Sequence, residues 1–230
     1  MDNRFSTYSQ FSEIDNLSQK LREKYGNIEN FLNSFLQIFE REILLSERKF
    51  YAHFKREEEF DEGGMKNFLL FFRDIVRLKS KLSVEDIKKS GFSFSVKNMD
   101  FRKGSGFPIF DGHLSCGAGD ILPFLQNTLL WFEEEEGGVA MLHPVEKSVL
   151  FTMRMSDFMP FDVGNLTIVR WVPFFYLLKH FIIPPFNIEP EKWQKAMMFA
   201  IKNMMTTSLI FLFRNTALQN GKRLLANGIF

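Results

Sequence analysis

The feature that most constrains the fold of this chain is a long run of apolar side chains spaced three and four residues apart. Between Ile28 and Ile43 these positions hold leucine or phenylalanine, and polar or charged residues fill all but one of the positions between them. An α-helix gathers such a pattern on one face, which is then buried against the rest of the protein. The run therefore predicts a long amphipathic helix from residue 28 to about residue 58.

Other segments combine the same periodicity with signals for the start of a helix. Ser83 with Asp86 three residues later marks one start, because each can cap the other's backbone. Pro190, flanked by two glutamates, marks another. Together these patterns predict a mainly α fold, with helices at about 12–24, 28–58, 65–79, 83–90, 120–132, 189–204 and 207–226.

A short segment departs from the helical pattern. From Phe92 to Lys97 apolar and polar residues alternate, which is typical of a β-strand, and a glycine-rich stretch follows. Residues 148–153 and 166–171 are interpreted as two more short strands. We therefore expect two helical lobes with a small β hairpin between them and terminal arms. The expected divisions are an N-terminal arm (1–15), an N-terminal lobe with the strand and turn (16–118), a C-terminal lobe (119–206) and a C-terminal helix or arm (207–230).

Charge is distributed very unevenly along the chain, although the formal net charge is only +1. Residues 73–103 carry nine basic and four acidic side chains, and residues 170–230 carry eight basic and two acidic ones. The intervening residues 104–169 carry two basic and nine acidic side chains. Because local potential rather than total charge attracts a polyanion, the two basic blocks predict a surface for nucleic acid.

The sequence offers no catalytic arrangement. It has no glycine-rich phosphate-binding loop, its four histidines lack metal-ligand spacing, and its single cysteine excludes an intrachain disulfide. We therefore expect no enzyme activity, no catalytic residue, no metal and no cofactor. The polar start of the chain does not resemble a signal peptide, and no uncharged apolar run is long enough to span a membrane, so we expect an intracellular protein without membrane insertion.

The basic segments suit contacts with the phosphates of a nucleic acid. Lysine and arginine beside flexible glycine turns suit phosphate contacts, because the backbone amides can approach the ligand as well. A second basic set lies around Arg170 and on the following helix. The residues predicted to contact nucleic acid, which the resemblance described next implies to be RNA, are Lys88, Lys89, Lys97, Arg102, Lys103, Arg170, Lys179 and Lys202.

The order of segments resembles a known family. Helices are followed by KKSGFSFSVKNMDFRKGSG, by a helix with LPFLQNTLLWF, by PFDVGNLTIVRW, by the helix IEPEKWQKAMMFAIKNMM and by a terminal RLLANGIF. This layout, over residues 85–230, looks like the nucleocapsid proteins of segmented negative-strand RNA viruses of the orthobunyavirus and tospovirus type. The first 60 residues are longer and more acidic than that family's pattern, and the net charge is less basic.

The resemblance implies a viral nucleoprotein that encapsidates single-stranded genomic RNA in a basic cleft between two lobes. It implies a homo-oligomer that forms through terminal arms, a viral polymerase as a further partner, and location in the host cytoplasm and the virion. The residues implied as anchors on neighbouring subunits are Phe5, Phe11, Leu224, Leu225, Ile229 and Phe230.

Two alternatives remain open. The first is a bacterial or phage regulatory domain that binds a small molecule, and no nucleic acid, in a pocket among its phenylalanine and methionine side chains; the chain has 29 Phe and 11 Met. The second, with weaker support, is a hydrolase built around Asp111 and His113.

Overall fold

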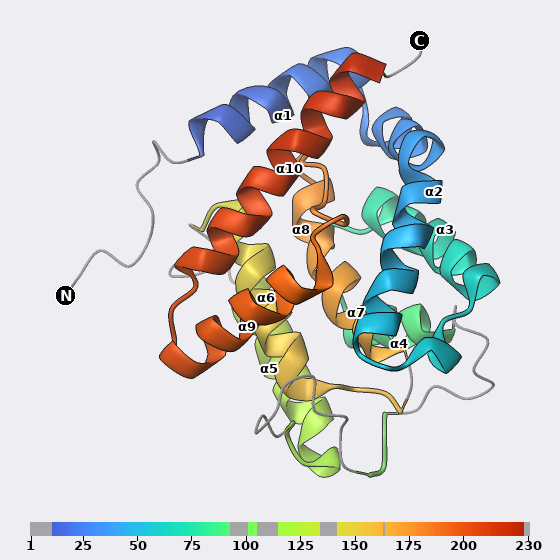
Figure 1. Cartoon of the computed structure of the whole chain (residues 1–230), viewed down its shortest axis with the longest axis vertical. Helices are drawn as coiled ribbons and strands as arrows, with labels where there is room; N and C mark the ends of the chain where they lie inside the picture. Colours follow the sequence, from blue (N-terminus) through green and yellow to red (C-terminus); the bar gives the residue numbers. More distant parts are fainter. Residues whose placement is uncertain (1–10, 93–100, 105–114, 134–141, 163, 228–230) are drawn as a thin grey trace.

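The computed structural model describes residues 11–92, 101–104, 115–133, 142–162 and 164–227, and all regular elements within these ranges are helical. Figure 1 shows helices packed around a central group formed by α6, α7 and α8. The α-helices are α1 (Ser12–Tyr25), α2 (Ile28–His53), α3 (Glu62–Leu78), α4 (Val84–Phe92), α5 (Ile121–Glu133), α6 (Pro144–Phe158), α7 (Asn165–Trp171), α8 (Phe175–Leu178), α9 (Pro190–Asn203) and α10 (Thr207–Asn227). Three short 3₁₀ helices are η2 (Glu57–Glu59), η3 (Ala118–Asp120) and η4 (Val172–Phe174).

The long helix predicted from the apolar spacing is α2, which ends at His53, before the predicted end. Asn27 caps it, since its side-chain oxygen accepts a hydrogen bond from the Asn30 amide at 2.9 Å. The whole predicted stripe from Phe31 to Ile43 is buried. The prediction of a mainly α fold is confirmed.

The segments predicted as strands at 148–153 and 166–171 are helical, in α6 and α7, so this part of the fold prediction is wrong. Every residue of α7 is buried, and α6 is buried on most of its surface. Burial on most sides places apolar residues at most positions, so the helical period is obscured and a short segment of this kind can be taken for a strand. The start of α6 is set instead by a capping box between His143 and Glu146.

The predicted β hairpin is not seen, and no strand occurs among the residues that the structure describes. Its first residue, Phe92, is the last residue of α4, and residues 93–97 lie outside the described ranges. The predicted division into two lobes stays a prediction. One cluster of buried apolar side chains runs from Phe11 to Leu224, and α4 and α5, from either side of the predicted boundary at 118, pack together.

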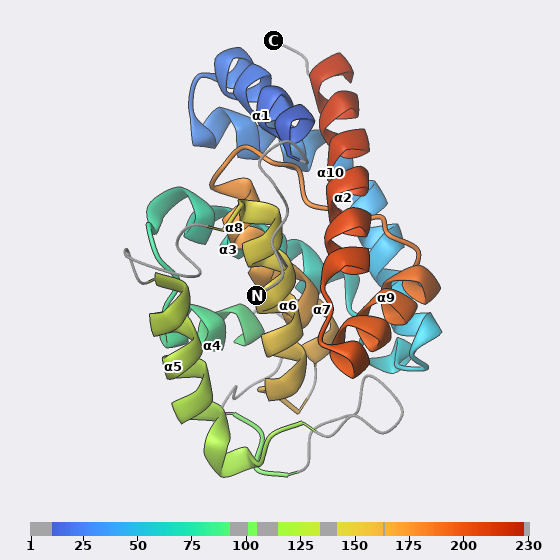
Figure 2. The same cartoon turned by 90° about the vertical axis from the view of Figure 1, so that its left-hand side faces the viewer.

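The last helix, α10, packs along α1 (Figures 1 and 2). The contact is close at Gly221, where an added Cβ atom would lie 2.6 Å from Leu17 Cδ2. A side chain at this position would therefore force the Leu17 side chain, and with it the packing of the two helices, to shift. Within the described ranges, no helix is long and apolar enough to cross a membrane.

Candidate functional site

Helix α5 has an unusual surface for an element at the edge of the molecule. From Ile121 to Phe132 it contains no charged residue. Four large apolar side chains on it, Leu122, Phe124, Leu130 and Trp131, are 39% to 67% exposed. A surface helix normally places charged residues on its outer face, so α5 presents an apolar surface that the described part of the chain does not cover.

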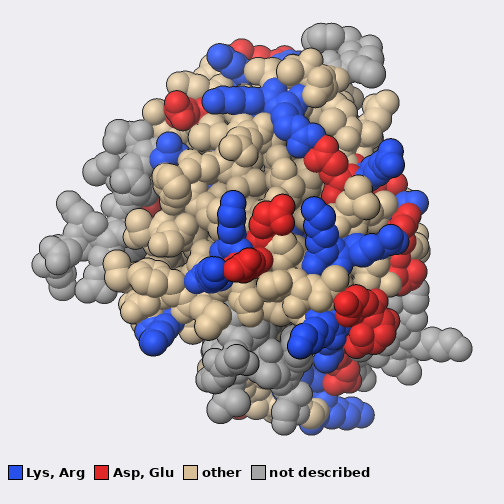
Figure 3. All heavy atoms as spheres, viewed as in Figure 1, with Lys and Arg blue, Asp and Glu red and all other residues tan. Residues whose placement is uncertain are grey.

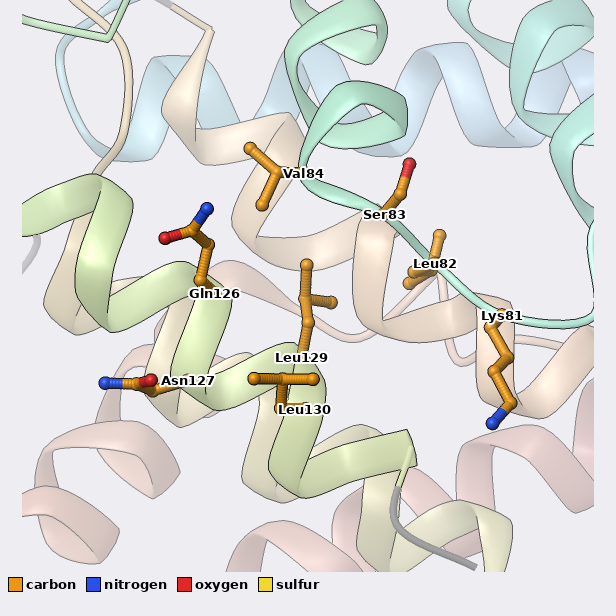
Figure 4. Close-up of a pocket in the computed structure, with 8 residues that line it drawn as sticks. All are labelled: Lys81, Leu82, Ser83, Val84, Gln126, Asn127, Leu129 and Leu130. Atoms are coloured by element: carbon orange, nitrogen blue, oxygen red, sulfur yellow. The ribbon is translucent and has the colours of Figure 1, made fainter.

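A groove of about 770 Å³ runs between α5 and the segment that leads into α4 (Figure 4). Leu82 and Leu129 are buried beneath it, Val84 is half-buried, and Leu130 is largely exposed. This volume is in the range of small-molecule sites. We call it the α4–α5 groove, lined by Lys81, Leu82, Ser83, Val84, Gln126, Asn127, Leu129 and Leu130.

The wall of the groove on the α4 side is held by the cap of that helix. The Ser83 amide and hydroxyl both donate to Asp86 Oδ2, at 3.0 and 2.6 Å, and the Asp86 amide donates back to Ser83 Oγ at 3.1 Å. These bonds satisfy the Ser83 hydroxyl within the protein. The side chains left to hydrogen-bond a ligand include the amides of Gln126 and Asn127, which are exposed on α5 and can both donate and accept.

A second polar cluster is sealed inside the protein around Glu47, which is 0% exposed. Its Oε1 accepts from Arg170 Nη1 at 2.5 Å and from Trp171 Nε1 at 2.8 Å, while Oε2 accepts from Thr167 Oγ1 at 3.2 Å. Tyr51 completes the cluster through a 3.0 Å hydroxyl contact with Thr167, and burial raises its pKa. We call these five residues the Glu47 cluster; they join α2 to α7 and leave no path for a ligand.

Arg170 and Arg102, both predicted to contact RNA, are 2% exposed. Arg170 Cζ lies 3.3 Å from the centre of the Phe50 ring, and its Nη2 donates to the Phe186 carbonyl at 2.9 Å. Arg102 donates from Nε to the Met159 carbonyl at 2.7 Å and from Nη2 to the Phe158 carbonyl at 3.0 Å, at the end of α6. Both side chains are therefore occupied inside the fold and cannot contact a phosphate.

The remaining predicted RNA-binding lysines do not form one surface. Lys89 and Lys103 are exposed, Lys88 lies over the Phe101 ring at 4.9 Å, and Lys97 is outside the described residues. Figure 2 shows α4 and α9 on opposite sides of the molecule. The exposed Lys202 on α9 is therefore separated from the lysines of α4. The half-buried Lys179, whose pKa is lowered by burial, follows α8.

The residues expected to anchor neighbouring subunits are mostly in the core where the structure describes them. Phe11 stacks on the His143 ring with centroids 3.9 Å apart, and Leu224 is 0% exposed. Leu225 is partly buried against the same core. Phe5, Ile229 and Phe230 lie outside the described ranges. Self-association through terminal arms stays a prediction.

The described titratable groups offer no assembled catalytic pair. Burial raises the pKa of the Cys116 thiol and lowers the pKa of His143 and of His180. His143 Nε2 contacts Asp15 Oδ1 at 2.9 Å, and its Nδ1 accepts from the Val145 amide, so both ring nitrogens are used in the fold. No group of three or more possible metal ligands occurs in the described part of the chain. Asp111 and His113 lie outside it.

Comparison with known proteins gives a likeness of fold. No family model matches the sequence, and no curated protein matches it. A crystal structure of a Fic family protein from Desulfovibrio desulfuricans G20 matches with a TM-score of 0.65 at 10% identity, over 98% of this chain and 77% of that chain. The predicted resemblance to viral nucleoproteins is therefore wrong, because a bacterial helical protein shares the fold over nearly the whole chain.

Sequence reasoning missed the residues of the α4–α5 groove. The available signal was the absence of charged residues from Ile121 to Phe132. A surface helix that buries only one face normally carries charged residues on the other face, so this absence indicates an apolar outer face. The groove is also lined by leucine and valine rather than by the phenylalanine and methionine expected for a pocket. Most described phenylalanines instead pack against one another in the core.

Proposed function

We propose that this chain is a ligand-binding regulatory domain that takes a mainly apolar molecule in the α4–α5 groove and acts without nucleic acid. The observation that carries the proposal is the groove itself, whose apolar surface continues onto an uncharged helix. Removing apolar surface from water favours binding by about 25 cal/mol per Å². The fold shared with a bacterial protein supports this alternative over RNA encapsidation.

The shape and chemistry of the groove define the ligand class. Leu82 and Leu129 form an apolar floor, and the amides of Gln126 and Asn127 lie on one side of it (Figure 4). A few polar groups beside an apolar floor favour a ligand with an apolar body and one or two hydrogen-bonding groups.

We propose further that the domain is not an enzyme. Cys116 is a poor nucleophile because burial raises its pKa and the thiolate is the reactive form. His143 is held by its bonds to Asp15 and Val145 and has no ring nitrogen left to act as a general base. Both observations support a binding role.

The fluorescent dye 1-anilinonaphthalene-8-sulfonate is a suitable first probe, because its emission rises in apolar sites. We expect saturable binding to the full chain at one site, and Leu130→Gln should weaken binding by about 10-fold because part of the apolar contact is lost. Leu70→Gln on α3 is the matched control, since Leu70 is an exposed leucine outside the groove. Equal loss of dye binding in both variants, or in neither, would refute the groove as the site.

A preparation of the full chain should also show an absorbance spectrum of pure protein, and its elution in size exclusion should not change after nuclease treatment. Native mass spectrometry of the same preparation tests for a bound molecule from the expression host. A retained apolar compound that is lost in Leu130→Gln would support the proposal. Retained nucleic acid that resists high salt would contradict it.

A further inference from the structure

The turn between α9 and α10 exposes a second apolar surface, remote from the α4–α5 groove. Five large side chains within 14 positions of sequence are 41% to 80% exposed, and Met204 at the turn has the highest value of these. We call them the α9–α10 tip, formed by Met198, Phe199, Met204, Met205 and Phe211. Contiguous exposed apolar side chains of this size mark an interaction surface rather than ordinary exposure.

The tip is convex. Met204 adopts a left-handed backbone with φ of 53° at the C-cap of α9, where the chain reverses into α10. Figure 1 shows this turn at the periphery of the molecule, at the lower left. Figure 3, in the same view, shows mostly tan surface there, with blue groups beside it and red groups next to some of them. Such a protruding surface suits a partner that can receive the Met and Phe side chains of the tip. It does not suit a partner whose own side chains must enter a groove.

The exposed face of α9 next to the tip is basic. Lys192, Lys195 and Lys202 are separated by three and seven positions, so they share one face of the helix with Met198 and Phe199. Glu191 is the acidic residue of this face and pairs with Lys195 at 2.7 Å. We call the three lysines the basic face of α9.

We propose that the α9–α10 tip docks on an anionic lipid surface, with its Met and Phe side chains at the level of the headgroups and the basic face of α9 against lipid phosphates. Amphipathic surfaces that combine Lys with Phe and Met bind at the interface of a bilayer without crossing it. This inference is independent of the proposed ligand groove.

The charge and shape of the tip favour an anionic lipid surface over a second copy of the chain or a partner helix. A second copy of the chain would place the basic face of α9 against an identical face in a two-fold contact, and like charges repel there. A partner helix requires a groove to receive its apolar residues, whereas Met204 protrudes. An anionic bilayer accepts both a protruding apolar tip and a basic rim.

The test is cosedimentation of the full chain with vesicles of phosphatidylcholine alone or mixed with phosphatidylglycerol. We expect binding to the mixed vesicles that weakens in high salt, and little binding to phosphatidylcholine alone. Met204→Gln with Phe211→Gln should reduce the apparent affinity about 10-fold or more. Lys192, Lys195 and Lys202 all changed to Gln should reduce it by at least about 10-fold.

Two controls keep the outcome decisive. Lys20, Lys66 and Lys89 changed to Gln lower the net charge equally but lie on α1, α3 and α4, so this variant should bind vesicles like the original protein. Circular dichroism confirms that each variant is folded. Equal binding to neutral vesicles, an equal loss in the control variant, or a dimer that the tip variant dissociates would each overturn the proposal.

Discussion

The Glu47 cluster and the outer face of α5 both depart from the usual distribution of polarity in a folded protein. The cluster buries charged groups, whereas α5 exposes apolar ones. Inside the protein, a carboxylate and a guanidinium are fully buried and hydrogen-bonded to each other and to their neighbours. On α5, Leu130 and Trp131 face solvent on a helix without charge. The buried charges are satisfied, so they serve the fold; the exposed apolar side chains have no cover among the described residues, so they are available for binding.

The comparison also separates stability from function. Substitutions in the Glu47 cluster should reduce the free energy of unfolding strongly, because a charge loses its partner without access to water. Substitutions on the outer face of α5 should leave that free energy nearly unchanged and alter ligand binding instead. The following experiments are ordered from the largest expected effect to the smallest.

Glu47→Ala should cause the largest loss of stability, about 3–5 kcal/mol, because it leaves the buried Arg170 guanidinium without its carboxylate. Urea unfolding followed by circular dichroism measures the change. Glu42→Ala is the matched control on the same helix. Glu42 pairs with Arg223 at the surface, both side chains being about 40% exposed, so its loss should cost at most about 1 kcal/mol. Equal effects of the two variants would show that the Glu47 cluster is not sealed.

Gly221→Ala should lower the free energy of unfolding by about 1–3 kcal/mol, because its Cβ would lie 2.6 Å from Leu17 Cδ2 and α1 would have to move from α10. Gly63→Ala is the control, since its Cβ would meet other atoms only at 3.7 Å or more. Thermal unfolding of both variants measures the difference. A Gly221→Ala protein as stable as the original would show that α1 and α10 can separate freely.

Acidification should destabilise the fold through His143, by less than either substitution above. Burial lowers the pKa of His143 in the folded protein, so the unfolded chain binds the proton more readily. Its contribution to stability is therefore complete above about pH 6.5 and is lost as the pH falls through the lower, folded pKa. Urea midpoints at pH 7.5 and pH 5 measure this loss. His143→Gln should reduce the dependence on pH; an unchanged dependence would assign it to other groups.

Leu130→Gln on α5 should have the smallest effect on the free energy of unfolding, within about 0.5 kcal/mol, because the side chain is 67% exposed. The same variant should lose affinity for the dye in the α4–α5 groove. A fall in stability comparable to that of Gly221→Ala would place Leu130 in the core. The outer face of α5 would then contribute to stability, as the Glu47 cluster does, and would not be reserved for binding.

The sequence alone determined most of the helices. The amphipathic stripe of α2 and the Ser83–Asp86 cap of α4 are local patterns, so their helices could be predicted without knowledge of the fold. The same reasoning failed for α6 and α7, because burial of most of their residues obscures the helical period. Nothing local in the sequence shows that α4 and α5 pack together.

The tertiary structure alone decided which charges are available to a partner. Arg102, Arg170, Lys89 and Lys202 all belong to the basic blocks. The sequence does not show which of them are exposed to a partner. Folding buries the first two against carbonyls and a carboxylate and leaves the other two exposed. Burial depends on contacts between residues far apart in the chain, here Glu47 with Arg170. The composition of a segment therefore fixes its charge, but only long-range packing fixes whether that charge faces a partner or the core.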